Sequence, residues 1–371
     1  MIYLDNAATT FPKPRCVTDE VVRCVRGYCG NPGRSGHKLS MLAAEKVYSA
    51  REALCTHLNF SSPENIVFTY NATYAINIAL RALLKPGDRV LVSDIEHNSV
   101  IRPLEVLKEE KNIEYSIFST DGDIGSVIRA KISDNTTAIV STLCSNVNGR
   151  RIPLEILSKI AKEKGLKLIV DSSQSLGHEK IDFSKTPADA LCAPGHKGLF
   201  GIQGCGFVLF NTSELYEPFF AGGSGTNSKS LNMPRTLPER YEPGTLSTPA
   251  IASLYAGVRF VDELGISEIC YREAKTVKKI KEDLSQIKEI ELYETDGALI
   301  LFNIKEKESE WVCQNLDRYG VYVRGGLHCA PMVHKKLGTE ERGAVRVSVS
   351  CLNGISDAEN FIKIITKILA E

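Results

Sequence analysis

The stretch IVFTYNATYAINIALRALLKPGDRVLVS, residues 66–93, contains the alternation from which the fold can be predicted. A β-rich run at 66–70 is followed by an amphipathic run at 73–85, and a second β-rich run begins at residue 89. Parallel strands need a crossover of about a dozen residues between them, and an amphipathic helix supplies one. The stretch therefore predicts a strand–helix–strand unit of a parallel sheet.

The alternation extends from this unit to residue 210. Its further β-rich runs and amphipathic segments are NSVIRPLEVLKEE (98–110), TTAIV (136–140), PLEILSKIAKEKG (153–165), KLIVD (167–171) and CGFVLF (205–210). Strands that alternate with helices predict an α/β fold, with a mainly parallel sheet wrapped by helices on both faces. Ligands of such sheets bind at the carboxyl ends of the strands, so we expect the functional residues there.

The pattern changes in the C-terminal part of the chain. A Gly- and Pro-rich stretch at 221–249 has little periodicity and is typical of loops. Helical segments at 251–264, 267–287 and 357–369 then combine with the β-rich runs ELYE (291–294), ALILFNI (298–304) and AVRVSVS (344–350). A chain of 371 residues exceeds what one core usually serves. We therefore expect a large domain at 15–250 and a smaller α+β domain made of 1–14 and 251–371.

Composition narrows the possible partners. The 45 Lys and Arg residues balance 45 Asp and Glu residues, which gives no reason to expect a nucleic acid or a membrane surface as partner, so a small molecule is the expected substrate. The opening MIYLDNAATT lacks the features of a secretory signal, and no apolar run approaches the roughly 20 residues that cross a bilayer. Nucleotide-binding fingerprints are missing as well. We expect a soluble, cytoplasmic protein.

The eleven cysteines are an odd number in a long chain without a signal sequence, so we expect most of them to be free thiols. Cys144, Cys192 and Cys205 lie in apolar, strand-like runs, where cysteine behaves as a small buried hydrophobe. Cys24 and Cys29 could be imagined as metal ligands, but no Cys/His pair at ligand spacing follows them. We expect no metal site.

Two charged residues lie where a parallel sheet presents its ligands. Asp171 directly follows the β-rich run KLIV, and Lys197 lies in PGHKG, where glycines restrict it to a tight turn. A lone lysine in a turn is usually a surface residue. However, a lysine that forms a Schiff base and an aspartate that keeps a pyridine nitrogen protonated are the two groups that pyridoxal phosphate requires. The pair therefore points to this cofactor.

The same edge of the sheet offers groups for a phosphate and a ring. Asn71, Ala72 and Thr73 form a turn between a strand and a helix, and amides at a helix N-terminus suit a phosphate dianion. Thr73 could instead be an ordinary N-cap. His97 follows the next β-rich run, where an imidazole can stack on the cofactor ring and assist proton transfer.

The sequence resembles a known family over nearly its whole length. It is similar to fold-type I pyridoxal-phosphate enzymes of the class V aminotransferase fold, specifically to cysteine desulfurases and selenocysteine lyases. The motifs that carry the resemblance are YLDNAATT (3–10), GHKLS (36–40), FTYNATYAIN (68–77), EHNS (96–99), SNVNGRRIPL (145–154), VDSSQSLGH (170–178), PGHKG (194–198), EPGT (242–245) and VRGGLHCAP (323–331). Their order and spacing together are specific, whereas no single motif is decisive.

The resemblance implies a role for each residue around the cofactor ring. Lys197 would hold pyridoxal phosphate covalently, and Asp171 would pair with its pyridine nitrogen. Gln174 would bond the phenolic oxygen, while His97 would stack on the ring and take part in catalysis.

It also implies how the phosphate is held. Thr73 and His196 would contact it, together with the turn that Asn71 and Ala72 begin. Thr245 matches a residue that reaches the phosphate of the other subunit, which implies a homodimer with shared active sites. Pro194 replaces a common serine and offers neither a hydroxyl nor an amide hydrogen to the phosphate.

The segment VRGGLHCAP distinguishes desulfurases from other members of the fold. The resemblance implies that Cys329 receives the sulfur of L-cysteine as a persulfide and leaves L-alanine, and that an acceptor protein collects the sulfur. His328 is a candidate to help this thiol ionise. Asn146, Arg324 and Arg346 are candidates for substrate contact, and we favour Arg346 for the carboxylate because a charge in an apolar strand needs an anion.

The sequence is also consistent with other functions. Selenocysteine presents the same carboxylate and amine as cysteine, so a selenocysteine lyase fits the same residues. Another class V transaminase or lyase would act without Cys329. A non-catalytic scaffold or a sulfur-relay binding protein would retain the fold without the cofactor.

Overall fold

The computed structural model describes residues 1–33, 35–216 and 218–371. Its main sheet has seven strands in the order β2-β8-β7-β6-β5-β3-β4. These strands are β2 (Ile66–Thr69), β3 (Arg89–Ser93), β4 (Glu114–Phe118), β5 (Thr136–Thr142), β6 (Lys167–Asp171), β7 (Ala190–Pro194) and β8 (Gly206–Phe210). The prediction of a mainly parallel sheet is confirmed, since all pairs from β7 to β4 are parallel.

Strand β8 departs from the parallel arrangement, because it is antiparallel to both β2 and β7. Only residues 195–205 connect β7 to β8. That connection is too short for a helical crossover, so the chain must turn back and pair antiparallel. This short turn carries Lys197, which is one of the predicted site residues.

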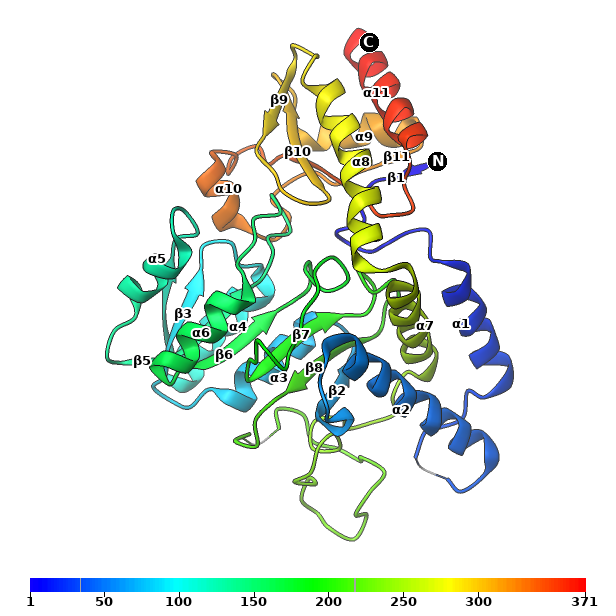
Figure 1. Ribbon diagram of the computed structural model, residues 1–371, viewed down its shortest axis with the longest axis vertical. Coiled ribbons are helices and arrows are strands. Elements are labelled where there is room, and N and C mark those ends of the chain that lie inside the picture. The colour runs from blue at the N-terminus through cyan, green and yellow to red at the C-terminus, as the bar shows by residue number, and fades with distance from the viewer. Residues whose placement is uncertain (34, 217) are drawn as a thin grey trace.

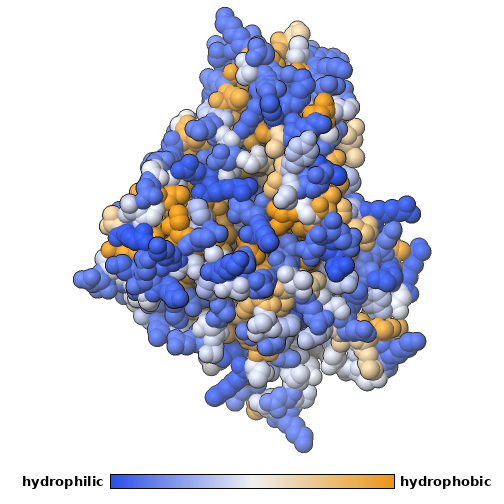
Figure 2. Space-filling view, in the orientation of Figure 1, coloured by the Kyte–Doolittle hydropathy of each residue, from blue (hydrophilic) through white to orange (hydrophobic). Residues whose placement is uncertain are grey.

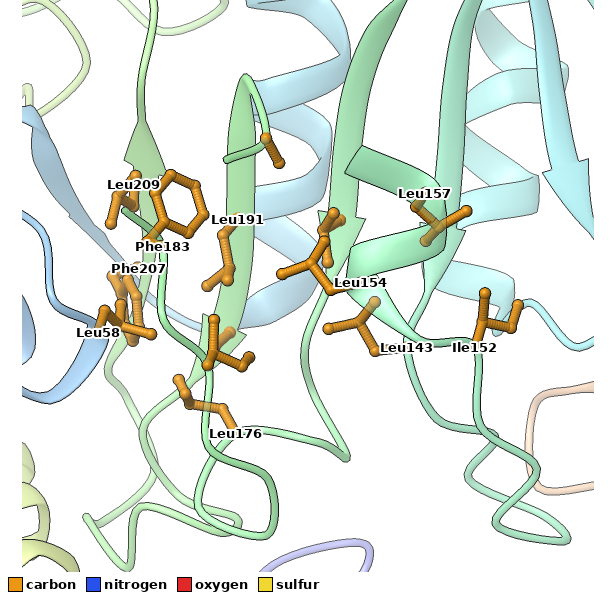
Figure 3. Packing of buried hydrophobic residues seen from close by; sticks show 14 of the residues in the cluster. Leu58, Leu143, Ile152, Leu154, Leu157, Leu176, Phe183, Leu191, Phe207 and Leu209 are labelled. Atoms are coloured by element: carbon orange, nitrogen blue, oxygen red, sulfur yellow. The ribbon is translucent and has the colours of Figure 1, made fainter. Parts of the chain in front are cut away.

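Helices cover both faces of this sheet, as predicted (Figure 1). They are α1 (Arg15–Gly27), α2 (Lys38–Leu58), α3 (Ala72–Leu83), α4 (Asn98–Lys111), α5 (Ile124–Lys131), α6 (Leu154–Lys164) and α7 (Thr248–Leu264). Successive side chains of a strand point to opposite faces. Accordingly Leu191 packs with Leu58 and Leu209 in one cluster, seen in Figure 3, whereas Cys192 packs with the helix α3 in another. We call the sheet and these helices the sheet lobe.

A smaller α+β layer forms the rest of the molecule, and we call it the small lobe. It contains the antiparallel sheet β12-β10-β9 and the parallel pair β1-β11. Its elements are β1 (Ile2–Tyr3), β9 (Ile290–Tyr293), β10 (Leu299–Ile304), β11 (Val321–Tyr322), β12 (Val345–Ser348), α8 (Ile266–Leu284), α9 (Ser309–Arg318), α10 (Pro331–Leu337) and α11 (Ile355–Ala370). Because β1 belongs to this lobe, both chain termini lie at the same end of the molecule (Figure 1).

The packing of the helix α7 is relevant to the boundary between the two lobes. Its residues Ile251, Leu254 and Val258 pack into the same hydrophobic cluster as the main sheet. The division after residue 250 stays a prediction. The packing of α7 favours a boundary at the junction with α8, next to Gly265.

Between β8 and α7, the described residues form neither helix nor strand, as the Gly- and Pro-rich composition of 221–249 predicts. A buried ion pair nevertheless fixes the end of this segment. Arg51 donates to both carboxylate oxygens of Glu242 at 2.6 Å, and the Phe68 amide donates to the same carboxylate at 2.6 Å. This pair fastens the residues that precede Thr245 to the edge strand β2.

The surface and the cysteines agree with the composition. Figure 2 shows hydrophobic residues in separate patches among hydrophilic ones. Within the described residues, no helix combines the length and apolar character that crossing a membrane requires. The same residues contain no group of three or more His, Cys, Asp or Glu side chains placed to hold a metal ion.

Cys144, Cys192 and Cys205 are buried, as their apolar context predicts.

The core of the sheet lobe gives a stability prediction. Leu191 in the interior strand β7 is fully buried, so Leu191→Ala should lower the free energy of unfolding by about 2 to 5 kcal/mol through lost burial and a residual cavity. The same substitution at the fully exposed Leu231 should change it by less than about 0.5 kcal/mol. Urea unfolding followed by circular dichroism measures both. Equal effects at the two positions would contradict the packing described here.

Candidate active site

A cavity of about 220 Å³ lies where the parallel strands end. Thr142, Asp171 and Pro194, the last residues of β5, β6 and β7, all line it, because parallel strands present their carboxyl ends at one edge. Nine of the residues singled out from the sequence also line this cavity: Asn71, Ala72, Thr73, His97, Asn146, Asp171, Gln174, His196 and Lys197. The structure thus brings together residues from five separate motifs, and their roles remain predictions.

Lys197 and Asp171 are the charged pair of the cavity. Burial lowers the pKa of Lys197 to about 8, although the carboxylate of Asp171 opposes that shift. Asp171 is itself buried and accepts hydrogen bonds from the amide and the hydroxyl of Ser173. An amine with this pKa is partly uncharged at neutral pH, and an uncharged amine can form a Schiff base or accept a proton.

His97 owes its orientation to the helix that follows it. It is the N-cap of α4, and its Nδ1 accepts a hydrogen bond from the Ser99 amide at 3.0 Å. An Nδ1 that accepts must be unprotonated, so Nε2 carries the ring proton. Burial lowers the pKa of His97 to about 4, which keeps the ring uncharged at neutral pH. Ser99 also lines the cavity, yet nothing in the sequence distinguishes it from a helix-start serine.

The first turn of α3 and His196 form a region suited to a phosphate. The first amides of a helix have no helical acceptor, and α3 begins at Ala72 inside the cavity. The Nδ1 atom of His196 is buried and has no hydrogen-bond partner among the described residues. Burial of such an atom is costly unless a ligand or water satisfies it. The donors and this orphaned nitrogen therefore fit the phosphate of pyridoxal phosphate.

The alternative interpretation of Thr73 as the N-cap is wrong. Asn71 is the N-cap, because its side chain accepts a hydrogen bond from the Tyr74 amide at 3.1 Å. The φ of Asn71 is −171°, which is extended backbone that any residue adopts. Gly206 in β8 packs closely against this turn, since an added Cβ would lie 2.6 Å from the Asn71 carbonyl carbon.

Gln174 and Asn146 are held by the backbone of other segments. Gln174 Nε2 donates to the Ala7 carbonyl at 2.9 Å, which leaves its second amide hydrogen for a ligand. Asn146 Nδ2 donates to the His328 carbonyl at 2.7 Å. Asn146 therefore connects the cavity to the turn that contains Cys329.

Cys329 does not line the cavity but lies on an exposed turn attached to it. Its carbonyl accepts a hydrogen bond from the Asn98 amide at 2.8 Å, directly after His97. Arg324 Nη2 lies 3.7 Å from the Cys329 sulfur and donates to it.

His328 cannot serve the neighbouring thiol in the expected way. The imidazole is turned inward and is 2% exposed, and it bonds to His334 and to the Arg324 carbonyl. Burial lowers the pKa of His328 to about 2, so it supplies no positive charge near the sulfur.

Arg346 is fully buried, and the anion that it needs comes from the chain itself. Its Nη2 donates to Asp5 Oδ1 at 2.7 Å and its Nη1 to the Asn146 carbonyl at 2.8 Å, while Nε has no partner among the described residues. Arg324 lies beside it, because the two backbones exchange hydrogen bonds of 2.8 and 3.2 Å. Asp5 lies in the motif YLDNAATT, but no sequence feature near it indicated that it pairs with Arg346.

Thr245 lies outside the cofactor cavity of its own chain. It lines a separate cavity of about 470 Å³ together with Tyr70, Tyr74 and Phe220. Within one chain, therefore, the structure does not bring Thr245 to Thr73 or His196.

A buried carboxyl group behind the site was also missed. Glu96 Oε1 accepts hydrogen bonds from the Ser93 hydroxyl and from the Thr142 amide at 2.8 Å, whereas Oε2 has no partner in the described part of the chain. Burial raises the pKa of Glu96 to about 8, and the nearby Asp171 adds to the shift. Its position directly before His97, at the end of a predicted strand, was the available signal.

Comparison with known proteins agrees with this fold. Residues 2–361 match the family model described as aminotransferase class-V, and the chain belongs to this family. A protein of Pyrococcus abyssi named "Probable cysteine desulfurase" is 30% identical over 100% of this chain and 94% of its own length. A "Cysteine desulfurase" of Yersinia pestis is 31% identical over 89% of this chain and 84% of its own length.

Solved structures show the same architecture. The apo structure of a cysteine desulfurase from Thermococcus onnurineus NA1 has a TM-score of 0.90 and 28% identity, and the match covers 100% of this chain and 94% of that one. The cysteine desulfurase CsdA of Escherichia coli has a TM-score of 0.88 at 22% identity, over 99% of this chain and 94% of that one, and it supports the fold alone.

The buried amine gives a prediction about reactivity in the protein without cofactor. Reductive methylation, which requires the uncharged amine, should modify Lys197 with a pH midpoint near 8. Asp171→Asn should lower this midpoint further, because the carboxylate raises the pKa of Lys197. Mass spectrometry of peptides follows the modification, with the exposed Lys180 as internal reference. A midpoint near the ordinary lysine value of about 10.4 would refute the burial described here.

Proposed function

We propose that this protein is a pyridoxal-phosphate-dependent cysteine desulfurase, which converts L-cysteine to L-alanine and takes the sulfur onto Cys329. The observation that carries the proposal is the shared cavity of Lys197, Asp171 and His97, whose lining residue Asn146 is bonded to the turn of Cys329. Relatives that match this chain over most of their length are named cysteine desulfurase, and this supports the same activity.

In the proposed complex, residues of one cavity hold all parts of the cofactor. Lys197 would bind it covalently, Asp171 would pair with its pyridine nitrogen, and Gln174 would offer its free amide hydrogen to the phenolic oxygen. Thr73 and His196 hold the phosphate with the first turn of α3. When bound, pyridoxal phosphate supplies an electron sink for the substrate α-carbon.

Lys197 and His97 have different roles: Lys197 transfers protons, and His97 donates a hydrogen bond. An amine with a pKa near 8 can accept the α-proton at neutral pH and later return it. His97 remains uncharged, with Nε2–H directed by its role as the N-cap of α4, and it can stack and donate one hydrogen bond without repelling the cationic groups nearby.

The sulfur transfer is assigned to Cys329. Its sulfur attacks the substrate sulfur, a sulfur–sulfur bond forms, and the carbon–sulfur bond of the substrate breaks. The electron pair of that bond stays with the substrate carbon, which takes a proton and becomes the methyl group of alanine. Arg324, which donates to the Cys329 sulfur at 3.7 Å, lies where it can attract the negative charge of the attacking thiolate.

Arg324, Arg346 and Asn146 are proposed to bind the substrate. The guanidinium of Arg346 already pairs with Asp5 and leaves only Nε without a partner. A substrate carboxylate would therefore engage this nitrogen and the neighbouring Arg324, rather than a fully free Arg346.

The proposal includes a cytoplasmic homodimer and a protein that accepts the sulfur. Exposed aromatic rings surround the cavity of Thr245, including the stacked pair Tyr74 and Phe220 and the neighbouring Tyr70 and Phe219. An exposed aromatic patch of this kind marks an interaction surface. A second subunit bound there would bring Thr245 toward the partner's phosphate site.

The experiment compares cysteine turnover in two matched variants. Cys329→Ala should lower alanine formation by about 100-fold, because the nucleophile is lost. Cys16→Ala, which removes another exposed thiol, should retain the wild-type rate. Alanine and sulfide are assayed with a thiol reductant present.

If Cys329→Ala kept full turnover, the protein would be another class V lyase or transaminase. Lys197→Ala should lose the visible absorption of the covalently bound cofactor. A wild-type protein that stays colourless with pyridoxal phosphate would point to a non-catalytic scaffold. Turnover of selenocysteine alone would indicate a selenocysteine lyase.

A further inference from the structure

We propose that the Cys329 thiol is positioned by a clamp between the two lobes, formed by Lys336 on the outside and by the His328–His334 pair on the inside. This inference rests on the proposed function, because it concerns the sulfur-accepting thiol. It assigns a role to the side chains of Lys336, His328 and His334, which do not line the cofactor cavity.

The first observation is the backbone of the turn. His328 and Cys329 have φ values of 52° and 56°, so two consecutive residues that are not glycine adopt the left-handed region. This conformation is disfavoured for residues that carry a Cβ atom. Such strain persists only where the surroundings enforce it. The turn is therefore held in place by other contacts.

Two of these contacts come from the sheet lobe. The Asn98 amide donates to the Cys329 carbonyl at 2.8 Å, and Asn146 Nδ2 donates to the His328 carbonyl at 2.7 Å. Both carbonyls of the strained turn thus point to donors in the other lobe. The turn itself belongs to the small lobe, since it follows β11 and precedes α10.

Inside the small lobe, a chain of hydrogen bonds supports the turn. His328 Nδ1 lies 3.0 Å from His334 Nε2, and His334 Nδ1 lies 2.8 Å from the Thr339 hydroxyl. The two rings are stacked with centroids 5.2 Å apart. Burial lowers the pKa of both histidines, so the rings are uncharged and share a single N–H···N bond. This pair fixes the turn to α10.

Lys336 fixes α10 to the sheet lobe. Its Nζ lies 2.9 Å from Asp94 Oδ2 and 2.8 Å from Asp121 Oδ1, and it also donates to the Thr120 hydroxyl at 3.3 Å. Because α10 begins two residues after Cys329, a shift of this helix would carry the turn with it. Lys336 and the histidine pair therefore set the position of the sulfur relative to the cavity.

A close contact between two backbone segments restrains the start of the turn that contains Cys329. An added Cβ at Gly343 would lie 2.6 Å from the Gly326 Cα, and the Ala344 amide donates to the Gly326 carbonyl at 3.2 Å. A sulfur held in this way is pre-organised for attack, and a misplacement of about 1 Å can cost about 100-fold in rate.

The experiment removes the outer contact. Lys336→Met should lower kcat for cysteine by about 10- to 100-fold with KM changed less than about twofold, since the substrate and cofactor sites are intact. The matched control is Lys335→Met on the same helix, an exposed lysine without a described ion pair, which should behave as wild type. Lys336→Arg should restore kcat, because the positive charge returns. Wild-type kcat in Lys336→Met would overturn the clamp.

A second readout does not depend on desulfurase activity. The rate at which iodoacetamide alkylates Cys329 in the protein without cofactor should change at least threefold in Lys336→Met and remain unchanged in Lys335→Met. If Lys336→Met fails to fold, Asp121→Asn removes one partner from an exposed site and should shift the alkylation rate in the same direction. An unchanged alkylation rate in the folded variants rejects the clamp.

The two proposals fail in different ways. Full activity of Cys329→Ala would overturn the sulfur-accepting role, whatever the clamp variants do. Inactive Cys329→Ala together with fully active Lys336→Met would reject the clamp alone.

Discussion

The structure depends on burying the amine of Lys197 beside the carboxylate of Asp171 at one edge of a parallel sheet. Removing an ammonium from water is costly, and its pKa falls because the uncharged form is favoured. The Asp171 carboxylate limits this shift, so the amine is reactive without being permanently uncharged. Only the order of β6, β7 and β8 brings the two groups into one cavity, and the short antiparallel return to β8 keeps Lys197 in a tight turn.

The N-terminal segment connects this edge to the small lobe. Strand β1 pairs with β11, and the Asn6 amide donates to the Ser348 carbonyl of the small lobe. A few residues later the Thr10 amide donates to the His196 carbonyl, next to Lys197. Between these contacts Asp5 neutralises Arg346, which lies beside Arg324. One short stretch therefore aligns the lysine turn with the arginines, and it leaves one net positive charge at the place where a substrate carboxylate is expected.

Local patterns predicted the sheet edge well, because strand ends can be recognised from residues close in sequence. Asp171, His97 and Lys197 follow β-rich runs or lie in a glycine-rich turn, and parallel strands necessarily gather such positions. Pairings over long sequence distances could not be predicted in the same way. Asp5 and Arg346 are 341 positions apart, and nothing near either residue indicates the other. The inward orientation of His328 likewise depends on His334 and on the packing of α10.

Burial reduces the number of thiols that could take part in sulfur transfer, since only Cys16, Cys29 and Cys329 of the eleven are exposed. Burial raises the pKa of Cys144, Cys313 and Cys351 to about 12, so these thiols stay protonated and inert near neutral pH. Cys329 is exposed, and Arg324 donates to its sulfur. An exposed nucleophile is usually mobile, which opposes accurate attack on a buried substrate. Bonds from the sheet lobe to the backbone of the turn resolve this conflict, because they restrain the backbone while the sulfur remains open to an acceptor.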